Sequence, residues 1–402
     1  MEKKFIKILK VIAIICVIVL IIELAYIVYC TFLGKEKPVY FDGINSLYQD
    51  DSGYVTVGSN NNNDNYYEKA KITKYNKKKE IVFEKLYNKG YNGAFFGVIQ
   101  DGSDYIAVGN YEATKKENKD KVRSALIVKY DKDGKILFEK DFQVLGDSKF
   151  TNVVSVDDGY IVSGQSIYEN MTLGNSSDGG AFLIKYSKDG EEQWMKNYGG
   201  NKSAVYNDLI IEDGFIYAVG KDATRTGIIS KYDLDGNHIK TTTFSYTDTI
   251  GFSGIVRHGD YLYVATGKKV SEDADNDDID AAIVIYDLDC NYVDDVTYQG
   301  KGIERYNRII KDHNDYLVVI GTTATLNKKT REYTYDGIIG KYDVDSSEVD
   351  VVSYGDERED YFTDIQLVGD EYLVVGYSSY EDGSYLSKFI RYSDSLKVLG
   401  VE

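Results

Sequence analysis

Residues 180–200 read Gly-Ala-Phe-Leu-Ile-Lys-Tyr-Ser-Lys-Asp-Gly-Glu-Glu-Gln-Trp-Met-Lys-Asn-Tyr-Gly-Gly. The segment 181–186 is rich in apolar and aromatic residues, which is typical of a β-strand. The Asp-Gly pair at 189–190 favours a tight hairpin turn, and a second strand pattern follows over 192–198. The stretch therefore predicts two antiparallel strands joined by a short turn.

The basic residue and tyrosine that end the first of these strands recur along the chain at spacings of 55, 56, 46, 54, 56 and 50 residues, with Ile285 in place of the basic residue in one repeat. Recurrence of one motif at similar spacings indicates a repeat architecture. The pairs are Lys74-Tyr75, Lys129-Tyr130, Lys185-Tyr186, Lys231-Tyr232, Ile285-Tyr286, Lys341-Tyr342 and Arg391-Tyr392.

A second marker gives the same count independently. It is an aromatic residue followed by alternating apolar residues that end at Gly58, Gly109, Gly164, Gly220, Gly267, Gly321 and Gly376. A third marker, nine or ten residues before that aromatic, is Ile44, Phe95, Phe150, Tyr206, Phe252, Tyr306 and Phe362.

Each repeat is predicted to contain four short strands, a to d. In the third repeat they cover 150–156, 160–163, 181–186 and 192–198. Four-stranded repeats of this length favour a seven-bladed β-propeller with antiparallel blades, an all-β fold that hides most sheet edges. Residues 38–41 either pair beside the last strand d or lead straight into the first blade, so the sequence leaves ring closure open.

The stretch 180–200 resembles the repeats of bacterial secreted and lipoprotein β-propellers in the WD40-like and quinoprotein-like grouping. The resemblance weakens along the rest of the chain outside the N-terminal segment. It implies the fold and an exported setting, and it implies no activity, because function belongs to sites rather than to folds.

The N-terminal segment 11–32 has 22 residues and one charged group, Glu23. A helix of that length is long enough to span a bilayer. Four lysines precede the segment, so the positive-inside rule places the N-terminus in the cytoplasm and the rest of the chain outside. We therefore expect a cytoplasmic tail (1–10), a transmembrane signal anchor (11–32), a linker (33–40) and an extracytoplasmic propeller (41–402). Glu23 is either a tolerated acid or a contact for a partner helix.

The net charge of −18 argues against nucleic-acid binding, because an acidic surface repels phosphate. Cys290 is the one cysteine outside the apolar segment, so the propeller cannot form an internal disulfide. Three histidines provide little for a catalytic triad or a zinc site. We assign no catalytic residue from the sequence. Paired carboxylates remain an alternative that sequence cannot locate.

The loops between strands b and c vary in length, whereas the a–b and c–d turns stay short. Binding residues concentrate on variable loops of a rigid scaffold, which favours the face that carries the b–c and d–a loops. The most acidic loop contains Glu272, Asp273, Asp275, Asp277, Asp278 and Asp280. It has enough oxygens for calcium but no fixed ligand spacing, so a solvated acidic loop is the favoured interpretation. Beyond that calcium alternative, no cofactor is expected.

The leading hypothesis is a noncatalytic, membrane-anchored scaffold that binds a protein or a cell-wall polymer on the b–c/d–a face. One alternative is a membrane-tethered enzyme that acts on glycans through paired carboxylates. Another is a sensor ectodomain that signals through a partner membrane protein. The chain has 38 tyrosines, but 13 of them occupy the first and second repeat markers, so their number alone gives little support to a glycan-stacking surface.

Overall fold

The computed structural model describes residues 40–402 except for 62–66, 115–120, 143–146, 168–179, 200–203, 223, 225, 245–250, 270–278, 301, 327–331, 356–357 and 381–382. Tyr40–Glu402 forms one compact unit. The predicted membrane segment 11–32, with Glu23, lies outside the described residues. Among the residues that are described, no helix is long and apolar enough to cross a bilayer.

The described chain is all β, and its strands follow one another in sets of four. The first three sets are β1 (Asp42–Asp50), β2 (Gly53–Asn60), β3 (Lys69–Asn76), β4 (Ile81–Leu86); β5 (Tyr91–Asp101), β6 (Asp104–Thr114), β7 (Lys121–Tyr130), β8 (Ile136–Phe142); and β9 (Asp147–Val156), β10 (Gly159–Ile167), β11 (Gly180–Ser187), β12 (Glu192–Tyr198). The later sets are β13 (Val205–Glu212), β14 (Phe215–Lys221), β15 (Gly227–Asp233), β16 (His238–Phe244); β17 (Gly254–His258), β18 (Tyr261–Lys269), β19 (Ile279–Asp287), β20 (Tyr292–Tyr298); β21 (Ile303–Lys311), β22 (Leu317–Leu326), β23 (Tyr333–Asp343), β24 (Glu348–Tyr354); and β25 (Asp360–Val368), β26 (Glu371–Ser379), β27 (Tyr385–Ser393), β28 (Val398–Val401).

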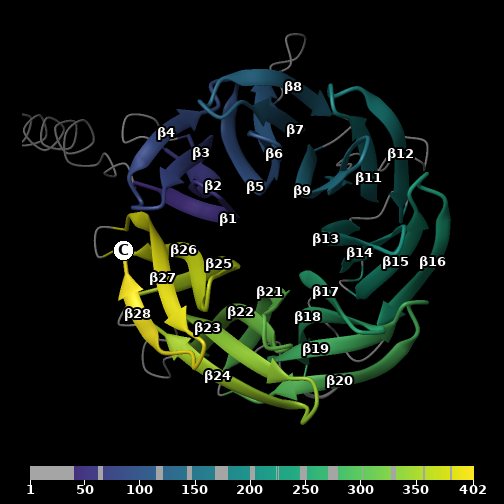
Figure 1. Ribbon diagram of the computed structural model, residues 1–402, viewed down its shortest axis with the longest axis vertical. Coiled ribbons are helices and arrows are strands. Elements are labelled where there is room, and N and C mark those ends of the chain that lie inside the picture. The colour runs from purple at the N-terminus through teal and green to yellow at the C-terminus, as the bar shows by residue number, and fades with distance from the viewer. Residues whose placement is uncertain are drawn as a thin grey trace, which may run out of the picture. The chain divides into compact units, whose positions relative to one another are not determined.

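Each set is an antiparallel meander, and the sets stand around a ring with their first strands nearest the centre (Figure 1). Five sets are separate four-stranded sheets. The other two form an eight-stranded sheet because one parallel bridge, between Ile279 and Ile303, links β19 to β21. This arrangement is that of a β-propeller, as the sequence predicts. The strands expected at 150–198 coincide with β9 to β12, and β12 has the expected bounds.

A bulge in the first strand of most sets explains the recurrent glycine. In β13 the pairing shifts between Tyr206 and Asp208, which places one extra residue in the strand. At this point a Cβ on Gly220 of β14 would lie only 1.8 Å from the carbonyl oxygen of Val205. Any side chain would therefore collide with backbone. Corresponding contacts of 1.8–2.2 Å occur at Gly58, Gly109, Gly164, Gly321 and Gly376.

The core lies between neighbouring sheets. Phe150, which opens the third repeat, is fully buried and packs edge-on against Phe182 at a ring-centroid distance of 5.7 Å. Burying one large apolar side chain stabilises the fold by about 1.5–3 kcal/mol. The same packing joins the last set to the first, where Ile44 and Leu47 pack against Leu373 and Val375. The third marker thus identifies core positions.

The ends of the described chain meet at the β25–β28 set. Tyr40 accepts a backbone hydrogen bond of 2.8 Å from Tyr385, and Phe41 forms a parallel bridge with the same residue. Tyr385 begins the third strand of its set, as Ile279 does in its own set. The chain therefore passes beside β27 and leads straight into β1, while β28 pairs with β27. Figure 1 shows β1 next to β25 and β26.

Candidate binding face

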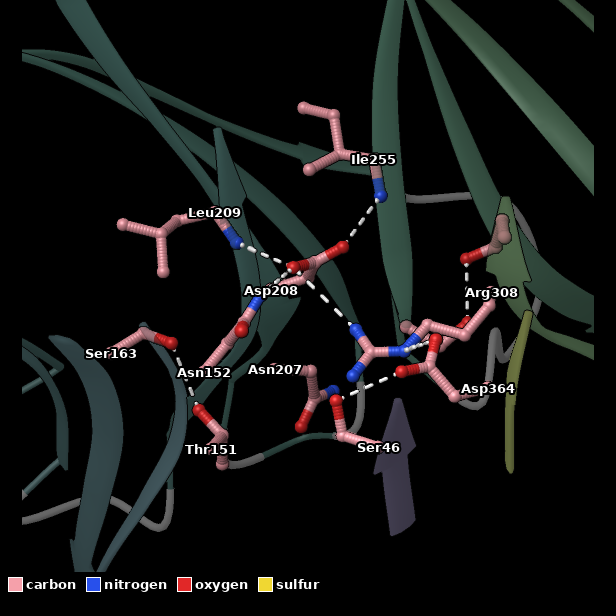
Figure 2. Close-up of polar contacts among 12 residues, drawn as sticks. Ser46, Thr151, Asn152, Ser163, Asn207, Asp208, Leu209, Ile255, Arg308 and Asp364 are labelled. Atoms are coloured by element: carbon pink, nitrogen blue, oxygen red, sulfur yellow. Dashed lines mark hydrogen bonds and ion pairs between the residues drawn. The ribbon is translucent and has the colours of Figure 1, made fainter. Parts of the chain in front are cut away.

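One residue per set, two positions after the third marker, lies at the ring axis, and in five of the seven sets it carries a side chain. Figure 2 shows that several of these side chains, although far apart in sequence, point toward one another. The positions are Ser46, Gly97, Asn152, Asp208, Gly254, Arg308 and Asp364.

Asp208 connects four sets. Its Oδ1 accepts the backbone N–H of Leu209 at 2.9 Å, and its Oδ2 accepts that of Ile255 in the next set at 3.1 Å. The side-chain amide of Asn152, in the preceding set, also donates to Oδ1. Arg308 Nη1 lies 3.5 Å from the same oxygen.

Asp364 repeats this pattern across the ring closure. Its Oδ1 accepts the N–H of Ile365 at 2.9 Å, and its Oδ2 accepts the N–H of Leu47 and the hydroxyl of Ser46, each at 2.8 Å. Arg308 Nε lies 3.7 Å from Oδ1. One guanidinium group therefore lies between two carboxylates (Figure 2).

Burial dominates the electrostatics of this cluster. It raises the pKa of Asp208, although Arg308 and three hydrogen bonds oppose the shift. Burial alone would lower the pKa of Arg308, but Asp208 and Asp364 outweigh it and raise that pKa. Both oxygens of each carboxylate are engaged by the protein itself. The two acids therefore join neighbouring sets, which gives the paired-carboxylate alternative no support at this position.

The repeated lysine and the tyrosine of the second strand meet on the face that carries the a–b and c–d turns. Lys74 Nζ and Tyr105 Oη both donate to Asp50 Oδ2 at 2.6 Å, and Tyr105 belongs to the next set. Burial favours the neutral acid, but these bonds and those from Ser52 hold the pKa of Asp50 well below its usual range. The same contacts join Asp101 to Lys129 and Tyr160, and Asp312 to Lys341 and Tyr372. The basic residue of the first marker and the aromatic residue of the second therefore hold neighbouring sets together.

Aspartate side chains in the c–d turns accept hydrogen bonds from the backbone of the same turn. Asp131 Oδ1 accepts the N–H groups of Asp133 and Lys135 at 3.0 and 2.8 Å. Asp287 accepts those of Asp289 and Asn291 in the same way. This turn chemistry accounts for the Asp-rich hairpins without a metal ion.

The predicted acidic site lies mostly beyond what the structure describes. Glu272, Asp273, Asp275, Asp277 and Asp278 fall within 270–278, outside the described residues. Asp280 is described and lies buried in β19 rather than in an open loop. Among the described residues, no group of three or more His, Cys, Asp or Glu side chains could hold a metal ion.

Five partly exposed aromatic residues form a continuous cluster on the b–c/d–a face, which runs from β23 across the last set to the point where the chain enters the ring. We call this cluster, Phe41, Tyr335, Tyr361, Tyr377 and Tyr385, the aromatic patch. Successive ring centroids lie 5.4 Å apart for Tyr335 and Tyr361, 5.1 Å for Tyr361 and Tyr377, and 5.9 Å for Tyr377 and Tyr385. Phe41 packs edge-on against Tyr377 at 5.6 Å. The patch thus draws residues from both ends of the propeller.

A carboxylate adjoins the aromatic patch. The hydroxyls of Tyr361 and Tyr385 both donate to Glu359 Oε2, each at 3.2 Å. Burial, with the charge of Glu359, raises the pKa of both phenols. Nearby, the guanidinium of Arg358 lies over the ring of Tyr380 at 5.0 Å. The site combines apolar rings, hydroxyls and a carboxylate on one surface.

Sequence reasoning missed this patch. Of its four tyrosines, none occupies a repeat marker, and three fall between positions 335 and 377. An excess of tyrosines outside the marker positions in the last two repeats was the available signal. The contact of Phe41 with Tyr377 depends on ring closure, which the sequence left open.

No family model matches this sequence, and no curated protein is similar to it. The structure is similar to that of Sqt1 from Chaetomium thermophilum, with a TM-score of 0.50 and 12% identity over 91% of this chain and 86% of that chain. Sqt1 bound to the N-terminus of the ribosomal protein L10 matches with the same score and identity over 91% and 90%. A putative 6-phosphogluconolactonase from Bacteroides fragilis matches with a TM-score of 0.48 and 15% identity over 81% and 86%. At these identities the likeness to Sqt1 concerns the fold alone.

Proposed function

We propose that this chain is a membrane-anchored, seven-bladed β-propeller that acts as a noncatalytic scaffold and binds a protein on its b–c/d–a face. The observation that carries the proposal is the aromatic patch. Protein interfaces are enriched in tyrosine, and a few such residues usually supply most of the binding energy. A partly exposed group of rings at strand ends has this character.

The comparison with Sqt1 supports the protein-binding part of the proposal. That propeller-like structure was determined in complex with the N-terminus of a ribosomal protein. A ring of this architecture can therefore present a surface to a polypeptide. A cell-wall polymer is the other partner class that the sequence indicates, and the experiment below distinguishes it.

The membrane part of the proposal rests on the sequence. Segment 11–32 would anchor the chain with residues 1–10 in the cytoplasm and the propeller outside the cell. Glu23 would be either a tolerated acid or a contact for a partner helix. Tyr40 and Phe41 enter the ring beside the start of β27, at the b–c/d–a face. The proposed binding face is therefore the face at which the described chain enters the ring.

The test is retention of cell-envelope components by the immobilised full chain, compared with two variants. Tyr361→Ala removes the ring of the aromatic patch that packs between Tyr335 and Tyr377. Tyr261→Ala removes an equally large side chain, 42% exposed, beside a turn of the opposite face. We expect a protein that is retained by the parent and by Tyr261→Ala but not by Tyr361→Ala. Thermal unfolding of each variant controls for folding.

Two results would contradict the proposal. Retention that survives Tyr361→Ala would remove the patch from the interface. Release of sugars from wall material, without retention of any protein, would replace the scaffold by the glycan-directed enzyme.

A further inference from the structure

We infer that the aromatic patch and Glu359 together bind a lysine or arginine side chain that the protein partner presents on an extended segment. This inference rests on the proposed function and adds the chemistry of the partner.

The geometry suits a cation. Tyr361 and Tyr385 each direct a hydroxyl to the same oxygen of Glu359, so three groups converge at one point. Tyr377 lies between those two rings, with centroids 5.1 and 5.9 Å away. The face of a tyrosine ring attracts a cation, and a neighbouring carboxylate adds a charged hydrogen-bond acceptor. Glu359 itself is partly exposed.

The local charge also suits a cation. Both Glu68 and Glu359 lie close enough to Tyr377 to add to the effect of burial, which raises the pKa of that phenol. Arg358 supplies one positive charge, and its guanidinium packs over Tyr380. Two carboxylates against one guanidinium leave an excess negative charge beside the rings. The acidity of the chain as a whole would further attract a basic partner.

Two strand positions of this face that are equivalent to patch tyrosines carry lysine instead. Lys149 precedes Phe150 as Tyr361 precedes Phe362, and Lys221 follows Gly220 as Tyr377 follows Gly376. Lys149 is close enough to Lys221 that their repulsion, after burial, lowers its pKa. A cationic segment would thus be repelled from the β9 and β14 side of the face and directed to the aromatic patch.

A second acidic surface provides a matched control. A groove of about 480 Å³ on the turn face is lined by Asp343, Glu348, Asp350 and Asp394, with Val351 and Leu396 among its apolar residues. It has negative charge but lacks the cluster of stacked rings. Glu348→Gln there removes the same charge as Glu359→Gln does at the patch.

The experiment selects peptides from a random 12-residue display library on the full chain in detergent micelles. The enriched peptides are then measured by fluorescence anisotropy against the parent, Glu359→Gln, Tyr377→Leu and Glu348→Gln. We expect enriched peptides to contain lysine or arginine. Their affinity should fall about tenfold with Glu359→Gln and with Tyr377→Leu, and stay unchanged with Glu348→Gln. Replacing the basic residue of the peptide by glutamine should remove the effect of Glu359→Gln.

Enriched peptides without a basic residue that still require Tyr377 would overturn this inference while leaving the scaffold in place. Cationic peptides that lose affinity with Glu348→Gln instead would move the cation site to the turn face. Binding of soluble wall glycans through Tyr377, with no peptide enriched, would overturn both the inference and the protein-binding proposal. An absence of any enriched peptide would also overturn the inference.

Discussion

The hydroxyl of Thr363 donates a hydrogen bond of 2.6 Å to the carbonyl oxygen of Ile44, although 319 residues separate them. The same contact joins consecutive sets within the chain, as between Ser253 and Tyr306 at 2.6 Å. Further examples are Asn45 to Phe95, Thr151 to Tyr206, Asn207 to Phe252 and Asn307 to Phe362. The ring thus closes by repeating its ordinary inter-set contact.

Removing the Thr363 hydroxyl, which joins the last set to the first, should lower the free energy of unfolding no more than removing an equivalent hydroxyl between two consecutive sets. Thr363→Val keeps the shape of the side chain and leaves the Ile44 carbonyl without this donor, so we expect a loss of about 1 kcal/mol in the free energy of unfolding. Thr151→Val removes the corresponding internal bond and is the control. Urea unfolding measures both. A much larger loss for Thr363→Val would show that closure is a special weak point.

The glycine of the second marker should tolerate no side chain. A Cβ at Gly376 would lie 1.8 Å from the carbonyl oxygen of Tyr361, so Gly376→Ala must displace backbone and should cost more than about 3 kcal/mol. Gly369→Ala places a methyl group where nothing lies within 4 Å, at φ of +62°, and should cost about 1–2 kcal/mol. Chemical denaturation compares them. Equal losses would mean that the close approach is not what selects glycine.

Arg308 should contribute much more to the free energy of unfolding than an exposed cation does. Arg308→Met leaves Asp208 and Asp364 without their shared guanidinium, and we expect a loss of about 3–5 kcal/mol. Lys140→Met breaks an exposed pair with Glu191 and should change stability by less than about 1 kcal/mol. Thermal and urea unfolding give both values. If the two variants lose equal stability, the cluster of Asp208, Arg308 and Asp364 does not stabilise the ring.

Asp50 should contribute to acid sensitivity. Its folded pKa lies below its usual value of 3.8, so the ionised carboxylate stabilises the fold above that pH. This contribution is lost as the pH falls below 3.8 toward the folded pKa. Asp50→Asn should therefore be less stable at pH 7 and lose less stability below pH 4 than the parent does.

Urea midpoints between pH 7 and pH 2 measure this dependence. Asp133→Asn, at a turn position where the carboxylate is 73% exposed, is the control and should follow the parent curve. If the urea midpoint of Asp50→Asn depends on pH as that of the parent does, Asp50 does not contribute to the acid sensitivity of the fold.

The anchor has its own prediction. A reporter enzyme that is active only outside the cytoplasm, fused after Glu402, should be active in cells that express the full chain. Replacing Lys3, Lys4, Lys7 and Lys10 by glutamine should reduce that activity, because the charge bias is lost. Activity of a cytoplasm-specific reporter at the same position would reverse the proposed topology.

The repeat pattern was sufficient to predict the four-stranded sets because each marker has a local physical cause. Gly220 is required by a backbone oxygen 1.8 Å from its missing Cβ. Lys74 and Tyr105 are required by the buried carboxylate of Asp50, which needs donors from its own set and from the next. Such requirements recur wherever the unit recurs, so one sequence shows them repeatedly.

The predicted site did not follow from the same reasoning. Loop length and acidity directed attention to the segment with Glu272 and Asp273, which lies outside the described residues. The buried position of Asp280 in β19 shows that an acidic run can continue into a strand. The aromatic patch was not predicted, because its tyrosines share no motif.

The sequence alone determined the fold of this protein, because bulges, tight turns and inter-set locks constrain residue types at fixed spacings. Only the tertiary structure decided which side chains share a surface. Phe41 and Tyr385 stand at opposite ends of the propeller sequence, yet their rings lie 5.9 Å apart because the ring closes between them. Asp208, Arg308 and Asp364 meet for the same reason, since side chains at one level of a closed ring point to a common axis.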